Sequence, residues 1–502
     1  PVNNPSAAKT RRNYILDRMY KLDYIDAETH AAARNEEDTG KLHVVQTGAQ
    51  APWVAEMVRD EMVRRFGQEA YTSGYEVVTT LDTGRQAAAN AALRSALRDY
   101  SKRHGYRGPE AQAKLEGKEP GDWPGLLRDH PVRGGLSAGL VVQLEEKAVQ
   151  VLLRSGETIG IDWDGLSWAR PYKSANRKGA EPKAAADILA VGDIIRVEAG
   201  EEGKWLLAQV PQAQGALVSL RPQDGAIVAL VGGFDFGGSK FNRVTQAKRQ
   251  PGSSFKPIIY SAALESGFTP ASIINDAPVV FDDAALEATW RPENYSGKFY
   301  GPTRLREALY RSRNLVSIRV LRTVGASVAA GYAERFGFAA EQLPEDLTLA
   351  LGSATATPLQ MARAYAVFAT GGYRVDPYFI SRIHDAGGNV IEAARPVVVC
   401  PDCPQALENL AGQLQPLPLA RTVITTQNAW LMDSMMRDVI QRGTGQRARA
   451  LGRSDLAGKT GTTNDQKDAW FCGYNPSLVA VAWVGFDRLE PLGRGETGGR
   501  AA

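Results

Sequence analysis

The chain has 502 residues, of which 43% are hydrophobic and 23% are charged. This composition is ordinary for a globular protein and disfavours a disordered chain or a coiled coil, and the length predicts two or more domains. Lysine and arginine number 59 against 56 acidic residues, a net charge of +3, and this near-balance gives no reason to expect a nucleic-acid partner.

The sequence shows no membrane anchor. No run reaches the roughly 20 apolar residues that a membrane-spanning helix needs, and no signal peptide is recognisable. The chain begins at Pro1 instead of methionine. We therefore expect an upstream segment to be missing, and the lack of an anchor is no argument for a cytosolic protein.

The first hundred residues predict helices around one strand. Apolar side chains recur at helical spacing in residues 10–23 and 53–66, which predicts two amphipathic helices. Residues 74–81 (GYEVVTTL) are rich in β-branched side chains, as in a strand. An alanine-rich helix is expected to follow from about Gln86 to Tyr100.

Between about Lys102 and Pro211 the sequence has short strands and many turn signals. Candidate strands cover residues 136–144, 148–153, 193–198 and 205–209, with a loop at 173–186. This pattern predicts an inserted all-β barrel or sandwich. Basic and aromatic residues mix at residues 170–173 and 176–178, but we favour a solvated loop on a protein-docking module over oligonucleotide or sugar binding.

The remainder of the chain predicts an α+β domain. Candidate strands cover residues 216–220, 226–231, 456–460, 469–473 and 478–484. Helices lie between them, and the clearest runs from Thr357 to about Thr370, with Thr357 as its cap, Pro358 in its first turn and Gly371 at its exit. The sheet is therefore expected to be closed by distant parts of the chain.

Three cysteines are present, and Cys400 and Cys403 form a CxxC pair. A structural zinc site needs four ligands, and only Cys472 and a histidine could complete one here. A redox dithiol is a further alternative. We favour a small loop-closing disulfide, which suits an oxidising compartment.

The sequence favours serine acyl transfer with a lysine, instead of a histidine, as the base. Acyl transfer needs a nucleophile, a base that takes its proton and donors for the oxyanion. The chain has five histidines, and none lies near a GxSxG elbow, so a Ser-His-Asp triad is disfavoured. A lysine whose proton is held weakly can replace the histidine.

The segment from Gly252 to Pro257 offers such a lysine. Ser253 is expected at or near a helix N-terminus with Lys256 at i+3, so their side chains share one face, about 5–6 Å apart at Cβ. The positive end of the helix favours developing negative charge. Gly252 permits a tight turn, Pro257 is tolerated in the first turn, and the helix is expected to end at Gly267.

Two further motifs follow Ser253 in chain order. Ser312-Arg313-Asn314 is an SxN motif, and Lys459-Thr460-Gly461-Thr462 is a KTGT motif. Each motif alone is weak, because a second SxxK occurs at residues 6–9 and a second SxN at residues 174–176. The ordered set is strong, because each motif supplies a separate role in one mechanism.

In these motifs the sequence resembles the penicillin-binding transpeptidases. Other similar phrases are GYEVVTTLD (74–82), FNRVTQAKRQPGSSFK (241–256) and WRPENY (290–295), with residues 351–372 and 459–487. The likeness covers nearly all of residues 50–502 and is to the bifunctional class A proteins, of the 1a type in Gram-negative bacteria.

The resemblance implies a multidomain fold. Its implied parts are the last helices of a glycosyltransferase domain (1–50), a helix-strand-helix linker (51–105), a small all-β OB-like insert (106–213) and an α+β transpeptidase domain, an antiparallel sheet flanked by helices (214–502). The family's glycosyltransferase glutamates lie in an E-D-x-x-F context, and Glu37-Asp38 lacks the phenylalanine. We expect this chain not to polymerise glycan, whereas its parent protein would.

The resemblance also implies the roles of the motif residues. Ser253 would attack the carbonyl of a D-Ala-D-Ala stem peptide. Lys256, held neutral by desolvation and by the neighbouring Lys459, would take its proton. Ser312 would relay a proton to the leaving group, and Asn314 would orient Lys256 and hold the substrate amide.

The KTGT strand is expected to hold the donor. Lys459, Thr460 and Thr462, with Gly461 between the threonines, would bind the donor's terminal carboxylate. The backbone N–H groups of Ser253 and Thr462 would form the oxyanion hole. No metal and no cofactor is implied. Trp290, Tyr295 and Tyr310 could line the cleft, but core packing is an equal alternative for each.

The resemblance implies partners and a location as well. An amine acceptor from a second stem peptide would resolve the acyl-enzyme, and β-lactam antibiotics would be trapped as stable esters. Cell-wall activator proteins are expected as partners, and nucleic acid is not. The location would be the periplasmic face of the bacterial inner membrane, through an N-terminal anchor absent from this chain.

Two other functions share the acylation step. A serine β-lactamase or D,D-carboxypeptidase would use water as the acceptor. No Glu-rich loop follows SxN to position that water, and the extra domains argue against a stand-alone hydrolase. A non-catalytic β-lactam sensor would be acylated but would transfer nothing, and a D-amino acid exchange assay would distinguish it.

Overall fold

A computed structural model describes residues 5–36, 49–279, 281–282, 289–403, 406–410 and 413–502. The chain divides into two units, Pro1–Ala49 and Gln50–Ala502. In the first unit, helices α1 (Pro5–Lys21) and α2 (Ala27–Asn35) pack together. Asp17 on α1 accepts hydrogen bonds from His30 at 2.8 Å and from Arg34 at 2.6 Å, both on α2.

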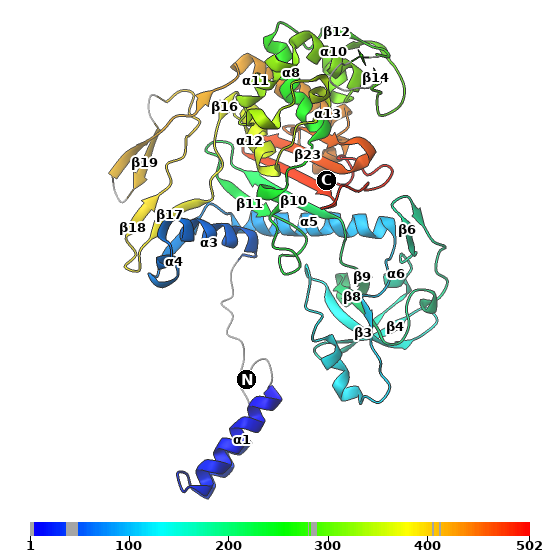
Figure 1. Cartoon of the computed structure of the whole chain (residues 1–502), viewed down its shortest axis with the longest axis vertical. Coiled ribbons are helices and arrows are strands. Elements are labelled where there is room, and N and C mark those ends of the chain that lie inside the picture. The colour runs from blue at the N-terminus through cyan, green and yellow to red at the C-terminus, as the bar shows by residue number, and fades with distance from the viewer. Residues whose placement is uncertain (1–4, 37–48, 280, 283–288, 404–405, 411–412) are drawn as a thin grey trace. The chain divides into compact units, whose positions relative to one another are not determined.

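The second unit contains a five-stranded antiparallel sheet with the order β11-β10-β24-β23-β22 (Figure 1). Its strands are β10 (Gln214–Leu220), β11 (Ile227–Val231), β22 (Ala457–Thr462), β23 (Asp468–Asn475) and β24 (Leu478–Gly485). Strands from both ends of the domain therefore pair within one sheet, as predicted, and β22 forms one edge.

Two predicted helices pack on this sheet. Helix α12 (Pro358–Ala369) lies on β10, β23 and β24 and begins with a capping box: the Gln360 N–H donates to Thr357 Oγ1 at 3.2 Å, and the Thr357 N–H donates to Gln360 Oε1 at 2.9 Å. Helix α5 (Thr83–His104) lies along β10 and β11. The Gln86 side-chain amide makes hydrogen bonds to both backbone groups of Leu230 at the β11 edge.

The second unit contains further α-helices outside the inserted module. They are α3 (Pro52–Phe66), α4 (Glu69–Thr72), α7 (Arg243–Gln246), α8 (Lys256–Glu265), α9 (Leu305–Tyr310), α10 (Asn314–Val324), α11 (Ala326–Glu334) and α13 (Thr426–Arg442). The 3-10 turns are η4 (Gly252–Phe255), η5 (Ala340–Gln342), η6 (Leu347–Leu351), η7 (Gln446–Leu451) and η8 (Asn464–Gln466).

Smaller sheets complete the domain. Strand β1 (Glu76–Thr79) pairs with β17 (Ile380–His384), which pairs with β18 (Val390–Ala393). The two-stranded pairs are β12 (Ile273–Asp276) with β15 (Gly301–Arg304), β13 (Phe281–Asp282) with β14 (Thr289–Trp290), β16 (Tyr373–Arg374) with β21 (Arg421–Thr422) and β19 (Ala406–Leu410) with β20 (Gln413–Leu417).

The inserted module has its own sheet, ordered β2-β8-β3-β4-β5 with β9 on β8. The strands are β2 (Ala111–Gln112), β3 (Ser137–Leu144), β4 (Val149–Leu153), β5 (Thr158–Ile161), β8 (Asp193–Ala199) and β9 (Trp205–Ala208). Short helical turns are η1 (Pro120–Leu127), α6 (Trp163–Leu166), η2 (Ala185–Asp187) and η3 (Glu201–Gly203). The expectation of a plain loop at 173–186 is wrong, because the hairpin β6 (Tyr172–Ser174) and β7 (Arg177–Lys178) enters it; strands this short show no alternation.

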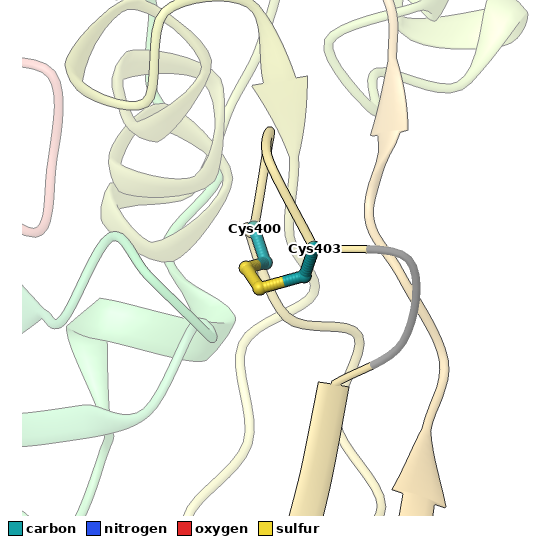
Figure 2. The surroundings of a disulfide bond; sticks show 2 residues. All are labelled: Cys400 and Cys403. Atoms are coloured by element: carbon teal, nitrogen blue, oxygen red, sulfur yellow. A yellow bond between two sulfur atoms is a disulfide. The ribbon is translucent and has the colours of Figure 1, made fainter.

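Cys400 and Cys403 are joined by a disulfide, with their Cα atoms 5.3 Å apart (Figure 2). This confirms the pairing that the sequence favours. Cys472 is a free thiol, buried in β23. Within the described ranges, no group of three or more His, Cys, Asp or Glu side chains is arranged to hold a metal ion.

Candidate active site

Ser253 lies in the η4 turn, directly before α8. Its side chain is half-buried and lines a cleft of about 700 Å³, and its carbonyl accepts the Lys256 N–H. Gly252 has a φ of +56°, and a Cβ there would stand 2.7 Å from the Thr462 carbonyl oxygen. Only glycine tolerates both this positive φ and so short a distance to a carbonyl oxygen. Gly252 therefore allows the turn to lie directly against β22.

Lys256 is fully buried at the start of α8. Its Nζ lies 2.7 Å from Asn314 Oδ1, 3.0 Å from the Ser312 carbonyl oxygen and 3.4 Å from Ser312 Oγ. Burial, and then the charge of Lys459, lower the pKa of Lys256 well below its ordinary value. Both causes disfavour the charged amine, so the site favours a neutral Lys256.

Lys459 approaches the same serine from the edge strand. Its Nζ donates to Ser312 Oγ at 3.0 Å and to the Thr460 carbonyl at 2.9 Å. The side chain is fully buried, and burial lowers the pKa of Lys459 to about 7, against the opposing effect of Cys472, its cross-strand neighbour. The hydroxyl of Ser312 therefore lies between two lysine amines.

Ser312 has a backbone conformation that is rare for residues other than glycine. Its φ is +59°, which costs on the order of 1–2 kcal/mol for an L-residue. Two backbone hydrogen bonds close the turn between α9 and α10: the Ser312 N–H donates to Leu309 O at 3.1 Å, and the Arg313 N–H to Ala308 O at 2.8 Å. The strain therefore lies at the residue whose hydroxyl faces both lysines.

Asn294 supports the SxN motif from the WRPENY segment. Its Oδ1 accepts the backbone N–H of Asn314 at 2.8 Å. Its Nδ2 donates to both carboxylate oxygens of the fully buried Asp276, at 2.8 and 2.9 Å. Asn294 belongs to none of the three motifs, although the phrase WRPENY that contains it carries part of the resemblance.

The KTGT residues form the β22 wall of the cleft. Thr460 and Thr462 line the cleft, and Thr460 Oγ1 lies 2.6 Å from Thr444 Oγ1. At Gly461, a Cβ would stand 2.3 Å from the Pro251 carbonyl oxygen. A side chain at this position would therefore push the strand away from the turn that carries Ser253.

The cleft brings distant parts of the chain together. Its lining residues include Ser253, Ser312, Asn314, Thr460 and Thr462, while Lys256 and Lys459 are fully buried and are not among them. Of the three aromatic candidates, Trp290 and Tyr295 line it. Tyr310 is not among the lining residues and lies beside the Arg311 and Arg442 guanidinium groups.

The two motif repeats are not among the residues that line the cleft. The SxxK at 6–9 is in α1, in the other unit, and the SxN at 174–176 is in the β6–β7 hairpin of the β module.

Thr497 and Gly499, close to the end of the chain, also line the cleft. No periodicity or motif in the sequence marked them, because their approach to β22 is purely tertiary.

Comparison with known families identifies the class of protein. The model of the penicillin-binding protein transpeptidase domain matches residues 215–485, and that of the penicillin-binding protein OB-like domain matches residues 106–213. The chain belongs to the penicillin-binding transpeptidases. This confirms the resemblance and the expected fold class, an α+β transpeptidase domain with a small OB-like domain.

The most informative relatives are named penicillin-binding protein 1A. The one from Pseudomonas aeruginosa is 48% identical over 100% of this chain and 64% of its own length, and the one from Escherichia coli is 40% identical over 97% and 63%. The chain thus spans just under two thirds of these curated relatives.

Solved structures agree with this assignment. The crystal structure of penicillin-binding protein 1A from Haemophilus influenzae matches with a TM-score of 0.87 at 38% identity, over 98% of this chain and 74% of that chain. PonA1 of Mycobacterium tuberculosis, in complex with penicillin V, matches with a TM-score of 0.55 at 22% identity, over 90% of this chain and 89% of that chain. This is a likeness of fold alone.

Across the described helices of the present chain, none has both the length and the hydropathy that crossing a bilayer requires.

Proposed function

We propose that this chain is a peptidoglycan D,D-transpeptidase, which cross-links stem peptides through a serine acyl-enzyme with Ser253 as the nucleophile. The observation that carries the proposal is the hydroxyl of Ser312 between the amines of Lys256 and Lys459, in the cleft that Ser253 also lines. A serine needs a base to react at neutral pH, and a buried amine with a lowered pKa is suited to that task.

The contacts of Lys256 suit a proton acceptor. A neutral amine has two N–H groups and one lone pair. Its two shorter contacts, to Asn314 Oδ1 and the Ser312 carbonyl, would take the two N–H groups. The lone pair is then left for the proton of Ser253 as the Oγ–carbon bond forms, and Ser312 would pass a proton to the departing D-alanine amine as the peptide bond breaks.

The β22 wall would bind the donor. A protonated Lys459 with the hydroxyls of Thr460 and Thr462 offers a cation and two donors to the terminal carboxylate, with Gly461 allowing the close approach of the strand. The N–H groups of Ser253 and Thr462 would stabilise the oxyanion, and losing one such donor costs roughly 3 kcal/mol of barrier. β-Lactams would acylate the same serine.

The whole protein would be larger than this chain. Its proposed features are an upstream peptidoglycan glycosyltransferase domain ending near residue 50, a membrane anchor, a location at the periplasmic face of the bacterial inner membrane, and activator proteins as partners. The fraction of the curated relatives that this chain spans supports such a longer protein.

Mass spectrometry after penicillin treatment tests the proposal. We expect one adduct of the mass of intact penicillin, mapped to the peptide that contains Ser253, and none in Ser253→Ala. D-amino acid exchange into a stem-peptide donor should accompany it. Acylation without exchange would instead support a sensor, and rapid release of penicilloate would support a hydrolase. An adduct that persists in Ser253→Ala would contradict the assignment of the nucleophile.

A further inference from the structure

Residues 492–500, here called the C-terminal strap, run from the linker helix to the wall of the cleft. At the first end, the Tyr100 hydroxyl of α5 donates to the Leu492 carbonyl at 2.7 Å. At the other end, Arg447 Nη1 donates to the Arg500 carbonyl at 3.1 Å. Both ends of the strap are therefore fastened to the folded domain.

The middle of the strap lies against the KTGT strand. The Gly498 N–H donates to Thr462 Oγ1 at 3.1 Å. A Cβ at Gly498 would stand 2.0 Å from the Trp470 carbonyl oxygen and 2.3 Å from that of Gly461. Only a glycine lets the strap approach this closely, and its neighbour Thr497 lines the cleft.

This contact has a consequence for the hydroxyl of Thr462. A threonine hydroxyl has one proton to donate and two lone pairs. Because Oγ1 already accepts the Gly498 N–H, its own proton cannot lie along that contact. That proton is then free to be donated to an anionic group in the cleft, which is the role proposed above for Thr462.

Glu496 anchors the strap two residues earlier. Its side chain is only 3% exposed, and its carboxylate accepts hydrogen bonds from Arg103 Nε at 3.0 Å and Arg103 Nη2 at 2.8 Å, with His104 Nε2 lying 3.2 Å away. Removing one partner of a buried ion pair leaves the other charge uncompensated. Among the residues that line the adjoining cavity of about 320 Å³, Glu496 is the one carboxylate beside several cations.

The OB-like module contributes to the same anchor. His104 Nδ1 donates to the Ala175 carbonyl at 2.9 Å, and the Arg494 N–H donates to Asn176 Oδ1 at 2.5 Å. Ala175 and Asn176 belong to the SxN repeat at residues 174–176. That repeat, which plays no part in the proposed reaction, thus holds the start of the strap.

We propose that Glu496 and Gly498 are positioning residues of the transpeptidase site: Glu496, paired with Arg103 and His104, holds the Gly498 N–H against Thr462, so that the Thr462 hydroxyl is aimed at the donor's carboxylate. The inference rests on the proposed function of Thr462. It extends the site to a segment that is fixed by the linker helix and the OB-like module.

The test compares acylation by penicillin G with acylation by its carboxyl methyl ester, which lacks the anion. Glu496→Gln should lower the second-order rate constant for the acid about tenfold and leave that for the ester unchanged. Glu496→Asp should recover part of the loss. Arg103→Gln removes the opposite partner and should lower the same acid-to-ester ratio, whereas Glu490→Gln, at an exposed residue just before the strap, should not.

Three outcomes would overturn the proposal. An unchanged ratio in Glu496→Gln and Arg103→Gln, with the wild type acylated, would remove the positioning role and leave the proposed function intact. An equal loss for acid and ester, with a lowered melting temperature, would reduce the strap to a structural support. A wild-type chain that neither compound acylates would overturn the proposed function itself and this inference with it.

Discussion

At the scale of single residues, the cleft depends on two buried amines with different surroundings. Lys256 faces a carbonyl and an amide oxygen with a second lysine nearby, and burial and that second charge lower its pKa well below its ordinary value. Burial alone lowers the pKa of Lys459, to about 7. In the proposed reaction a neutral Lys256 would take a proton, and a charged Lys459 would bind a carboxylate.

The opposite protonation requirements of these two lysines predict a bell-shaped pH dependence of acylation by penicillin G. On the acid side, the second-order rate constant should fall as Lys256 gains a proton and ceases to be a base. On the alkaline side, it should fall from about pH 7 upward, as Lys459 loses the charge that attracts the carboxylate. Stopped-flow acylation across the pH range provides the measurement.

The methyl ester of penicillin G is the matched control for the alkaline limb. With no carboxylate to attract, the ester should keep the acid limb and lose the alkaline one. If acylation by the free acid kept rising well above pH 7, Lys459 could not act as the proposed cation.

At the scale of elements, the turn that carries Ser253 is held by glycine contacts. Gly352, which follows η6, has a φ of +75°, and a Cβ there would lie 2.0 Å from the Gly252 carbonyl oxygen. The Gly252 N–H in turn donates to the Gly352 carbonyl at 3.3 Å. The position of the Ser253 turn is therefore determined on both sides by backbone, from η6 and from β22.

We predict that Gly352→Ala slows acylation by about tenfold or more, because the new methyl group must displace the turn that carries Ser253. Gly371→Ala is the matched control: its φ is +78°, but a Cβ there meets no atom within 4 Å. Both variants bear a left-handed strain of about 1 kcal/mol, so both should melt slightly earlier. Equal acylation rates in the two variants would show that the Gly252–Gly352 contact does not position the serine.

Elements with strong local signals are the ones that the sequence could predict. Thr357, Pro358 and the following apolar period defined α12, and the β-branched runs defined the long strands of the five-stranded sheet. The ordered set of three motifs predicts five residues that line the cleft, namely Ser253, Ser312, Asn314, Thr460 and Thr462. The positive φ of Ser312, the support by Asn294 and the strap were not predictable, because each depends on contacts between segments far apart in the chain.

At the scale of the whole molecule, helix α5 joins the OB-like module to the transpeptidase sheet. Toward its end, Arg98 and Lys102 both pair with Glu198 of β8, at 2.5 and 3.1 Å. Near its start, Gln86 bonds to β11. Since the same helix also supplies the partners of Glu496, one rigid element connects the module, the sheet and the strap.

The three cysteines allow the integrity of this assembly to be followed by thiol titration. Cys472 is completely buried opposite Lys459, and burial raises the pKa of its thiol to about 12, so it should react with a thiol reagent only when the sheet opens. We expect no reactive thiol in the native protein, one in denaturant, and three in denaturant after reduction of Cys400–Cys403.

Reduction without denaturant separates the disulfide from the sheet. It should expose two thiols and leave the penicillin acylation rate unchanged, because Cys400 and Cys403 are not among the residues that line the cleft. Cys472→Ala should abolish the thiol that appears in denaturant alone, which assigns that signal. If Cys472 instead reacted in the native protein at the rate of an exposed thiol, β22 and β23 would have to separate locally, and the cleft could not keep Lys459 buried beside Ser312.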